Sequence, residues 1–168
     1  MQTTSIITYI SDWLRDYVLS SNSEGFVIGI SGGIDSAVTS TLAARTGLPL
    51  ICIEMPIKQN KNQVERGLRH IQWLKKKFTN VKSTELELTS IFNQFSTILT
   101  SKKKSEIALV NMKARLRMTA LYYFAQTNNS LVLGTGNKVE DFGIGFFTKY
   151  GDGGVDISPI ADLLKSEV

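Results

Sequence analysis

The hydrophobic residues of the first twenty positions recur with helical spacing. Apolar side chains fall every three or four positions over residues 2–20 and therefore share one side of a helix. Ser23, Glu24 and Gly25 end this pattern. Residues 26–28 then form a short apolar run that is typical of a buried strand. The chain is thus expected to begin with an amphipathic helix that leads into an interior strand.

Helical and strand patterns continue to alternate along the rest of the chain. Helices are predicted over residues 37–45, 63–78, 91–98 and 107–126, and strands over residues 48–55, 84–88 and 131–133. A succession of strand, helix and strand is typical of a parallel sheet whose strands are joined by crossover helices. We therefore expect one α/β domain over residues 1–168, built on an open parallel sheet, with a last helix after Pro159.

A glycine-rich octet follows the strand predicted at residues 26–28. Its members are Gly29, Ile30, Ser31, Gly32, Gly33, Ile34, Asp35 and Ser36. The glycines let the backbone turn tightly and approach a ligand closely. The helix predicted after the octet presents unpaired N–H groups and the positive end of its dipole. Together these features predict an anion site at a strand-to-helix turn, suited to phosphate.

The octet differs from two common phosphate-binding motifs. It contains no lysine and so is not a Walker loop, and its glycines lack the spacing of a dinucleotide-binding G-x-G-x-x-G. It carries an acid instead, Asp35. A carboxylate beside a phosphate is repulsive unless a cation lies between them, which makes Asp35 a candidate Mg²⁺ ligand. The alternative is that Asp35 only caps the helix.

Residues 31–36 resemble the SGGxDS loop of the N-type ATP pyrophosphatases. The resemblance implies a Rossmann-like fold of the adenine nucleotide alpha hydrolase type. It also implies cleavage of ATP into AMP and pyrophosphate, which activates an acid or amide oxygen. GMP synthetases, NAD synthetases, argininosuccinate and asparagine synthetases and tRNA-thiolating enzymes share this loop. The octet therefore indicates the superfamily and leaves the substrate open.

A second polar, glycine-containing turn follows the last predicted strand. Residues 134–137 can bring backbone groups and the Thr135 hydroxyl to a nucleotide. Glu140 and Asp141 come shortly afterwards. Carboxylates from Asp35 and Glu140 are the hard oxygen ligands that a shared Mg²⁺ ion prefers. The alternative is that Glu140 and Asp141 merely favour the N-terminus of a helix.

The most specific resemblance lies in residues 145–154, which read GFFTKYGDGG. Such a segment suits neither a core strand nor a core helix, and in a loop it indicates a constrained site. Together with Asp156, Pro159 and Lys165 it resembles the ammonia-dependent NAD synthetases, as does the stretch at residues 111–118. Four motifs match in the same order, and the resemblance runs over nearly the whole chain.

The resemblance implies a reaction in two steps, the last of NAD biosynthesis. ATP adenylates the pyridine carboxylate of deamido-NAD (nicotinic acid adenine dinucleotide), pyrophosphate leaves, and ammonia attacks to give NAD and AMP. The residues that it implies are, for ATP, the eight of the octet with Thr135 and Lys165; for deamido-NAD, Arg115, Lys149 and Asp156; for Mg²⁺, Asp35 and Glu140; and for catalysis, Asp35 and Asp152.

The implied chemistry suits the residue types at these positions. Asp152, placed near the incoming ammonia, can attract ammonium and take up its proton as a general base. Because an adenylate is prone to hydrolysis, its site must exclude water. Phe146 and Phe147 can help there, or they can simply pack against neighbouring residues.

Two departures from the family pattern leave alternatives open. Between Glu140 and Gly145 the chain has one residue more than the bacterial enzymes, so that Asp141 competes with Glu140 as a metal ligand. Family members also continue past the position of Val168, with a segment that folds over deamido-NAD. We therefore expect an NAD synthetase domain without that segment. The alternatives are an inactive nucleotide-binding module of the same fold, or another ATP pyrophosphatase such as the GMP synthetase type.

Composition and charge limit the classes of partner that we expect for this chain. The net charge of +4 suits an anionic small molecule and gives little support for a nucleic-acid partner. Cys52 is the single cysteine and lies in an apolar run, so we expect a buried, inert thiol in a reducing, cytoplasmic setting. The sequence has no apolar run long enough to cross a bilayer, and we expect no membrane partner. The resemblance implies a homodimer, with residues 107–126 as the candidate contact.

Overall fold

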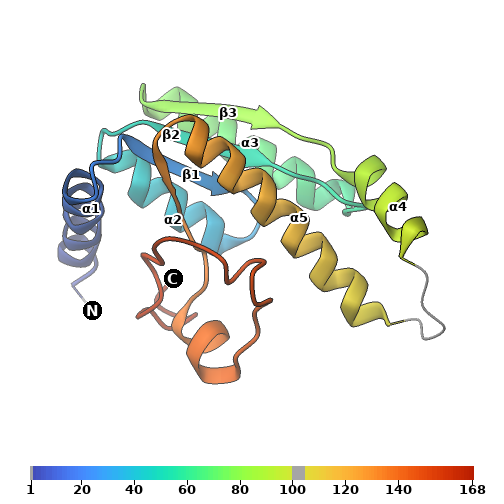
Figure 1. Cartoon of the computed structure of the whole chain (residues 1–168). Helices are drawn as coiled ribbons and strands as arrows, with labels where there is room; N and C mark the ends of the chain where they lie inside the picture. Colours follow the sequence, from blue (N-terminus) through green and yellow to red (C-terminus); the bar gives the residue numbers. More distant parts are fainter. Residues whose placement is uncertain (1, 100–104) are drawn as a thin grey trace.

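A computed structural model of the chain describes residues 2–99 and 105–168. Its central sheet consists of β1 (Gly25–Gly29), β2 (Leu50–Glu54), β3 (Val81–Glu85) and β4 (Ser130–Val132). The spatial order is β3-β2-β1-β4, and each neighbouring pair of strands is parallel (Figure 1). The predicted α/β fold with an open parallel sheet is confirmed.

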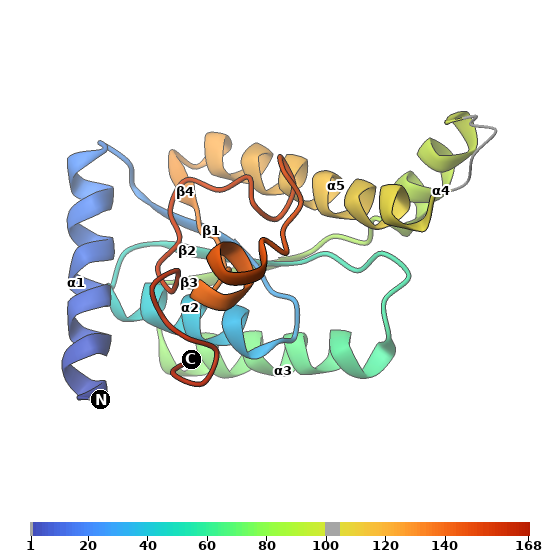
Figure 2. The ribbon, with the colours of Figure 1, turned by 90° about the horizontal axis from the view of Figure 1, so that it is seen from below.

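Helices flank this sheet on both faces. In the described part of the chain they are α1 (Thr3–Ser20), α2 (Ile34–Arg45), α3 (Lys61–Lys77), α4 (Thr89–Ile98) and α5 (Glu106–Thr127). Helices α4 and α5 lie on one face and α2 and α3 on the other, while α1 stands beside α2 (Figure 2). Each corresponds to a predicted helix. Within residues 2–99 and 105–168, none combines the length and apolarity that a membrane crossing requires.

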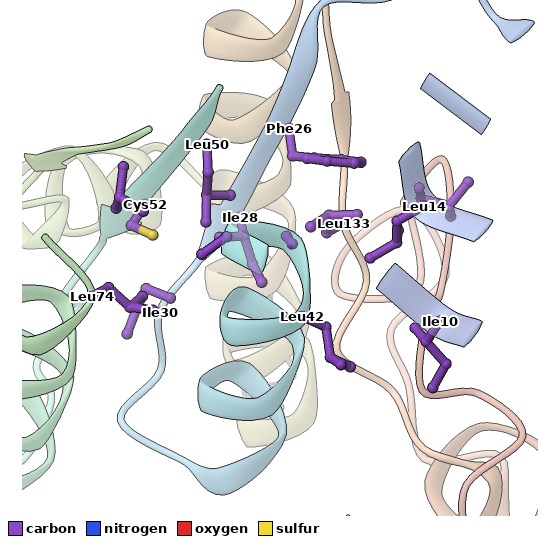
Figure 3. Packing of buried hydrophobic residues seen from close by; sticks show 14 of the residues in the cluster. Ile10, Leu14, Phe26, Ile28, Ile30, Leu42, Leu50, Cys52, Leu74 and Leu133 are labelled. Atoms are coloured by element: carbon purple, nitrogen blue, oxygen red, sulfur yellow. The ribbon is translucent and has the colours of Figure 1, made fainter. Parts of the chain in front are cut away.

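The apolar side chains of the strands feed two clusters, one on each face of the sheet. On the side of α1, α2 and α3 the cluster includes Ile28, Cys52 and Leu74 (Figure 3). On the side of α4 and α5 it includes Val27 and Phe92. Because successive side chains of a strand face opposite sides, one continuous apolar run supplies both clusters. This explains why the strands predicted at residues 26–28 and 131–133 are wholly apolar rather than alternating.

The order of strands reverses between β1 and β4. From β1 the chain passes through α2 to β2 on one side, whereas β4 follows α5 and lies on the other side of β1. In open α/β sheets, the crevice outside the carboxyl ends of the strands at such a reversal is the usual place for a ligand. The octet leaves β1 there, and residues 134–137 leave β4 there. Both turns that the sequence predicts to contact a nucleotide therefore begin at the same crevice.

The third strand begins three residues earlier than the sequence predicts. The prediction of residues 84–88 is wrong in its bounds, because pairing with β2 starts at Val81 and ends at Glu85. Leu88 is buried outside the strand, in the cluster beneath α4. An apolar residue that leads into a helix produces the same pattern as one inside a strand.

The helix predicted after Pro159 is wrong, because the described segment consists of turns. Three amides in this segment donate to carbonyls three residues earlier, as that of Leu163 does to Ile160 at 3.0 Å. In an α-helix the Leu163 carbonyl would accept from an amide four residues later. It instead accepts from the Lys138 amide at 2.9 Å, which fastens this segment to the turn after β4.

We predict that Cys52 is unreactive in the folded protein. Its side chain is fully buried, and burial raises the pKa of the thiol from 9.0 to about 12. The reactive thiolate should therefore be roughly a thousandfold scarcer in the folded protein than in the unfolded chain at mildly alkaline pH. Labelling with Ellman's reagent should be correspondingly slow. The same protein in guanidinium chloride is the control, and equal labelling rates would contradict the buried position.

Candidate functional site

The octet comprises the end of β1, a short turn and the first residues of α2. Helix α2 begins at Ile34, three residues earlier than the pattern predicts, so its N-terminus is part of the octet. Two serines fasten the turn: the Ser31 hydroxyl accepts from the Gly33 amide at 3.2 Å, and the Ser36 hydroxyl donates to the Gly33 carbonyl at 3.0 Å. The loop thus holds the positive end of α2 at the crevice, as an anion site requires.

Gly32 brings the octet into close contact with α3. Its φ of 76° lies in the left-handed region, and a Cβ at this position would overlap the carbonyl oxygen of Gln63. The Arg66 guanidinium donates through Nε to the Gly32 carbonyl at 3.3 Å. Both the backbone conformation and the close approach therefore require glycine here.

Asn137 connects the octet to the turn after β4. Its side chain is fully buried, and its Nδ2 donates to Asp35 Oδ1 at 3.1 Å across 102 positions of sequence. Its Oδ1 accepts from the amides of Val139 and Glu140, each at 3.1 Å. One amide group thus fixes Asp35 and the start of the segment that carries Glu140. The sequence analysis did not single out Asn137; its place two residues after Thr135 was the available signal.

Glu140 and Asp141 lie in a π-helix, η1 (Val139–Ile144). A π-turn contains more residues than an α-turn and is frequent at functional sites, so it accommodates the extra residue noted before Gly145. Gly145 ends η1 with a φ of 69°. The carboxylate of Asp141 lies against Gly136, and burial, more than the nearby Glu140 and Asp152, raises its pKa.

Lys165 joins the two carboxylates that the sequence predicts as metal ligands. Its ammonium group forms an ion pair with Asp35 Oδ2 and a second one with Glu140 Oε1 at 3.2 Å. The hydrogen bond to Asp35 is the main reason why the pKa of Lys165 is raised. Asp35 and Glu140 are thus close enough to share one cation, whereas Asp141 makes no such contact within residues 2–99 and 105–168.

We refer to Asp35, Glu140 and Lys165 as the ion cluster. Its two carboxylates fit Mg²⁺ if other ligands complete the coordination of the metal. Mg²⁺ prefers oxygen ligands and is commonly held by one or two carboxylates together with substrate phosphates and water. No group of three or more potential metal-binding side chains exists among the described residues. Asp35 and Glu140 already hold a cation, the Lys165 ammonium, between their carboxylates. The arrangement therefore suits a metal ion that arrives with a polyphosphate.

The structure has a cleft of about 960 Å³ at the carboxyl end of β1. It is lined by the first residues of the octet, Gly29, Ile30 and Ser31, and by Thr135. Sequence positions about a hundred residues apart therefore share one cavity, as the two predicted nucleotide turns require. A volume of this order is at the upper end of small-molecule sites, which reach roughly 1,000 Å³.

The far wall of the cleft comes from the GFFTKYGDGG segment. Phe146, Phe147, Thr148 and Asp152 line it, and the two phenylalanines are 77% and 49% exposed. They are therefore not core residues, which favours contact with a ligand over plain packing. Asp152 is held in place because its Oδ1 accepts from the Thr148 amide at 2.8 Å.

Arg117 anchors the cleft floor, a role that the sequence analysis did not assign. Its guanidinium donates to the Met55 carbonyl at 2.9 Å and to Gln59 Oε1 at 3.2 Å. Gln59 in turn donates to the Ser31 carbonyl at 3.5 Å. Helix α5 is thereby connected through the loop after β2 to the octet.

In the described part of the chain, the three residues predicted to contact deamido-NAD take no part in the ion pairs of Lys165 with Asp35 and Glu140. Arg115 donates through Nε to the Lys149 carbonyl at 3.3 Å, so these two lie side by side. Asp156 is elsewhere, accepting from the Tyr122 hydroxyl at 2.9 Å and the Val132 amide at 2.7 Å. None of the three belongs to the described lining of the cleft. Their assignment stays a prediction.

Comparisons with known proteins bear on the family and the fold of the chain. A sequence model of the family described as NAD synthase matches residues 6–168. The NH(3)-dependent NAD(+) synthetase of Sulfurisphaera tokodaii is 42% identical over 164 residues, which cover 97% of this chain and 57% of that protein. The chain therefore spans little more than half the length of this curated relative.

Solved structures show the same fold. The NMN synthetase from Francisella tularensis matches with a TM-score of 0.91 and 36% identity, over 99% of this chain and 68% of that one. The NH3-dependent NAD synthetase from Campylobacter jejuni matches with a TM-score of 0.89 and 36% identity, over 99% and 70% of the two chains. The fold that the resemblance implied is confirmed.

We predict that Gly32→Ala destabilises the protein more than Gly47→Ala. Both glycines have a positive φ, 76° and 77°, so both substitutions carry a backbone strain of about 1–2 kcal/mol. A Cβ at Gly47 meets nothing within 4 Å, whereas at Gly32 it overlaps the Gln63 carbonyl. Gly32→Ala should therefore cost roughly 1–3 kcal/mol more in free energy of unfolding by urea titration. Equal costs would show that the octet does not pack on α3 as described.

Proposed function

Since the chain belongs to the NAD synthase family, we propose that it amidates the nicotinate carboxylate of deamido-NAD with ammonia at the expense of ATP. The products would be NAD, AMP and pyrophosphate, and the enzyme would be a ligase that forms a C–N bond. The observation that carries the proposal is that Asp35, Glu140 and Lys165 meet in one set of ion pairs, while Ser31 of the same octet shares a cleft with Thr135. Two carboxylates and a lysine ammonium beside a helix N-terminus suit a polyphosphate that carries a metal ion.

ATP would bind with its phosphates at the octet. The N-terminus of α2 and the Lys165 ammonium offset the negative charge of the phosphates, and the Thr135 hydroxyl lines the same cleft. Asp35 and Glu140 would hold Mg²⁺. When bound, this ion neutralises phosphate charge as pyrophosphate departs. The support for this role is the fit of the two carboxylates to a shared cation.

Deamido-NAD would present its carboxylate to the α-phosphate inside the cleft. Phe146 and Phe147 are exposed on the wall of the cleft and can exclude water from the adenylate. Arg115, Lys149 and Asp156 would contact the rest of the dinucleotide. The side-by-side placement of Arg115 and Lys149 supports an anionic ligand there.

Asp152 would receive the ammonia. Ammonia is mostly ammonium at neutral pH, and a carboxylate on the cleft wall attracts the cation and takes up its proton before attack. Although Asp152 Oδ1 accepts from the Thr148 amide, a carboxylate has acceptor sites for further hydrogen bonds. Asp152 is thus both fixed in position and able to hold ammonium.

The partner that we propose besides the substrates is a second copy of this chain. Helices α4 and α5 carry exposed apolar side chains, among them Phe95 and Ile98 on α4 and Ile107 and Val110 on α5. Apolar surface of this kind is commonly covered by a protein partner.

A cytoplasmic setting is proposed from the unpaired Cys52 thiol, which suits a reducing compartment.

Three alternatives are distinguishable from the proposed function. The likeness to a protein named NMN synthetase favours the mononucleotide of nicotinic acid as an alternative substrate, because amidation of its carboxylate would give NMN. An inactive module would bind ATP without turning it over. A GMP synthetase type is disfavoured by the family to which the chain belongs.

The test is a chromatographic product assay with ATP, MgCl₂, ammonium chloride and either deamido-NAD or nicotinic acid mononucleotide. We expect AMP and NAD in equal amounts from the dinucleotide, and no NAD without ammonium. Preferential formation of NMN would favour the mononucleotide. ATP binding in calorimetry with neither product formed would contradict the proposal and favour the module.

Asp35→Ala should lower NAD formation at least about a hundredfold, because it removes a charge that holds the metal and phosphates in the transition state. Circular dichroism should show that the fold remains. Asp12→Ala, which removes an exposed acid on α1, is the matched control and should keep its activity. Similar activities of the two variants would refute the role of Asp35.

A further inference from the structure

Lys165 occupies the position where the two candidate metal ligands meet. Its ammonium contacts Asp35 Oδ2 and Glu140 Oε1 at once. We propose that Lys165 blocks the metal site of the nucleotide-free protein and vacates it by moving to the nucleotide phosphates, so that a divalent ion binds only together with the nucleotide. The inference deepens the proposed function and rests on its assignment of Asp35 and Glu140 to Mg²⁺.

An ammonium and a divalent ion cannot share these carboxylates. A Mg²⁺ ion bound by both would lie about 2.0–2.1 Å from an oxygen of each. The Lys165 Nζ already lies within hydrogen-bonding distance of the same two oxygens. Two cations in that space would repel each other strongly, because charges in partly buried surroundings are poorly screened. One of them must therefore leave when the other binds.

Lys165 is the member of the cluster that can move. Its side chain is 46% exposed and extends from a segment of turns rather than from a helix. The Asp35 side chain is only 15% exposed and is held by the buried amide of Asn137. The backbone of Glu140 is fixed by the same amide. The Asp35 carboxylate is thus anchored, whereas the Glu140 side chain is 40% exposed and only its backbone is fixed. The lysine has a flexible four-carbon stem and solvent beside it, so it can leave Asp35.

The candidate metal site also has too few oxygen ligands for Mg²⁺ until a polyphosphate binds. Within the described residues no third metal-binding side chain joins Asp35 and Glu140. A triphosphate changes the balance in two ways: it supplies oxygen ligands to the metal, and it offers Lys165 an alternative anionic partner. Since each change favours the other, binding of metal and binding of nucleotide should be positively coupled.

The proposal also explains how the carboxylates of Asp35 and Glu140 can lie close to each other. Two carboxylates that contact the same ammonium are close enough to repel each other, and the ammonium between them offsets this repulsion. Lys165 would therefore have two successive partners, the carboxylates before ATP binds and the phosphates afterwards.

The test is a titration of the protein with Mn²⁺ alone, with free Mn²⁺ followed by electron paramagnetic resonance. Removing the ammonium should open the site, so Lys165→Met should bind Mn²⁺ roughly tenfold more tightly than the wild type. Lys138→Met is the matched control: it removes a lysine nearby that forms no ion pair within residues 2–99 and 105–168. It should bind Mn²⁺ as the wild type does. Adding Asp35→Asn to Lys165→Met should abolish the gain.

The proposal is overturned if Lys165→Met binds Mn²⁺ no more tightly than the wild type, or if Lys138→Met shows the same gain. Lys165→Gln replaces Lys165→Met should the latter lose its thermal unfolding transition. Mn²⁺ binding with α,β-methylene ATP, which cannot be split at the reacting bond, separates the two levels of the argument. Suppose that Asp35→Asn weakens Mn²⁺ binding in the presence of this analogue, while Lys165→Met does not bind Mn²⁺ alone more tightly than the wild type. The metal site then stands, and the blocking role of Lys165 is refuted. If Asp35→Asn has no effect there, the metal site itself is refuted.

Discussion

The site depends on bringing the anionic side chains Asp35 and Glu140 together at the positive end of a helix. Two neighbouring carboxylates repel each other, and a phosphate between them would add to the repulsion. In the protein this is countered by the Lys165 ammonium, by the Asn137 amide and by the N-terminus of α2. The remaining features of the site, including the π-helix and the turns after Pro159, serve to deliver these groups to one place.

The parallel sheet makes that convergence possible. Strands β1 and β4 are neighbours in space although α2, β2, α3, β3, α4 and α5 lie between them in sequence. Their carboxyl ends open on the same crevice, where doubly wound folds place their ligands. The buried Asn137 fixes the relation between the two ends, and Arg117 connects α5 to the floor of the cleft. A rigid framework thus carries Asp35 and the backbone of Glu140, while the exposed Lys165 side chain remains adaptable.

The sequence predicted the features that depend on local spacing. Hydrophobic periodicity located every helix from α1 to α5 and the parallel sheet, and the glycines of the octet located the turn between β1 and α2 that carries Asp35. It could not predict contacts between residues far apart in sequence. Asp35, Asn137 and Lys165 meet only through the strand order, and nothing in the spacing of the chain indicates that Lys165 lies between two acids. The bounds of β3 were wrong because Leu86 and Leu88 are apolar for a different reason, their approach to α4. The prediction of a final helix was wrong because the Leu163 carbonyl, which a helix would use internally, accepts a tertiary hydrogen bond from the Lys138 amide.

The most direct measurement is a double-mutant cycle between Asp35→Ala and Asn137→Ala, read as free energies of unfolding in urea. If the two ends of the site are joined by the 3.1 Å hydrogen bond between these side chains, the double variant should be more stable than additivity allows. The expected coupling is about 1 kcal/mol, typical of a hydrogen bond to a charged group that is partly exposed. Additive effects, within about 0.3 kcal/mol, would mean that the turn after β4 is not held to the octet, and the shared site would be contradicted.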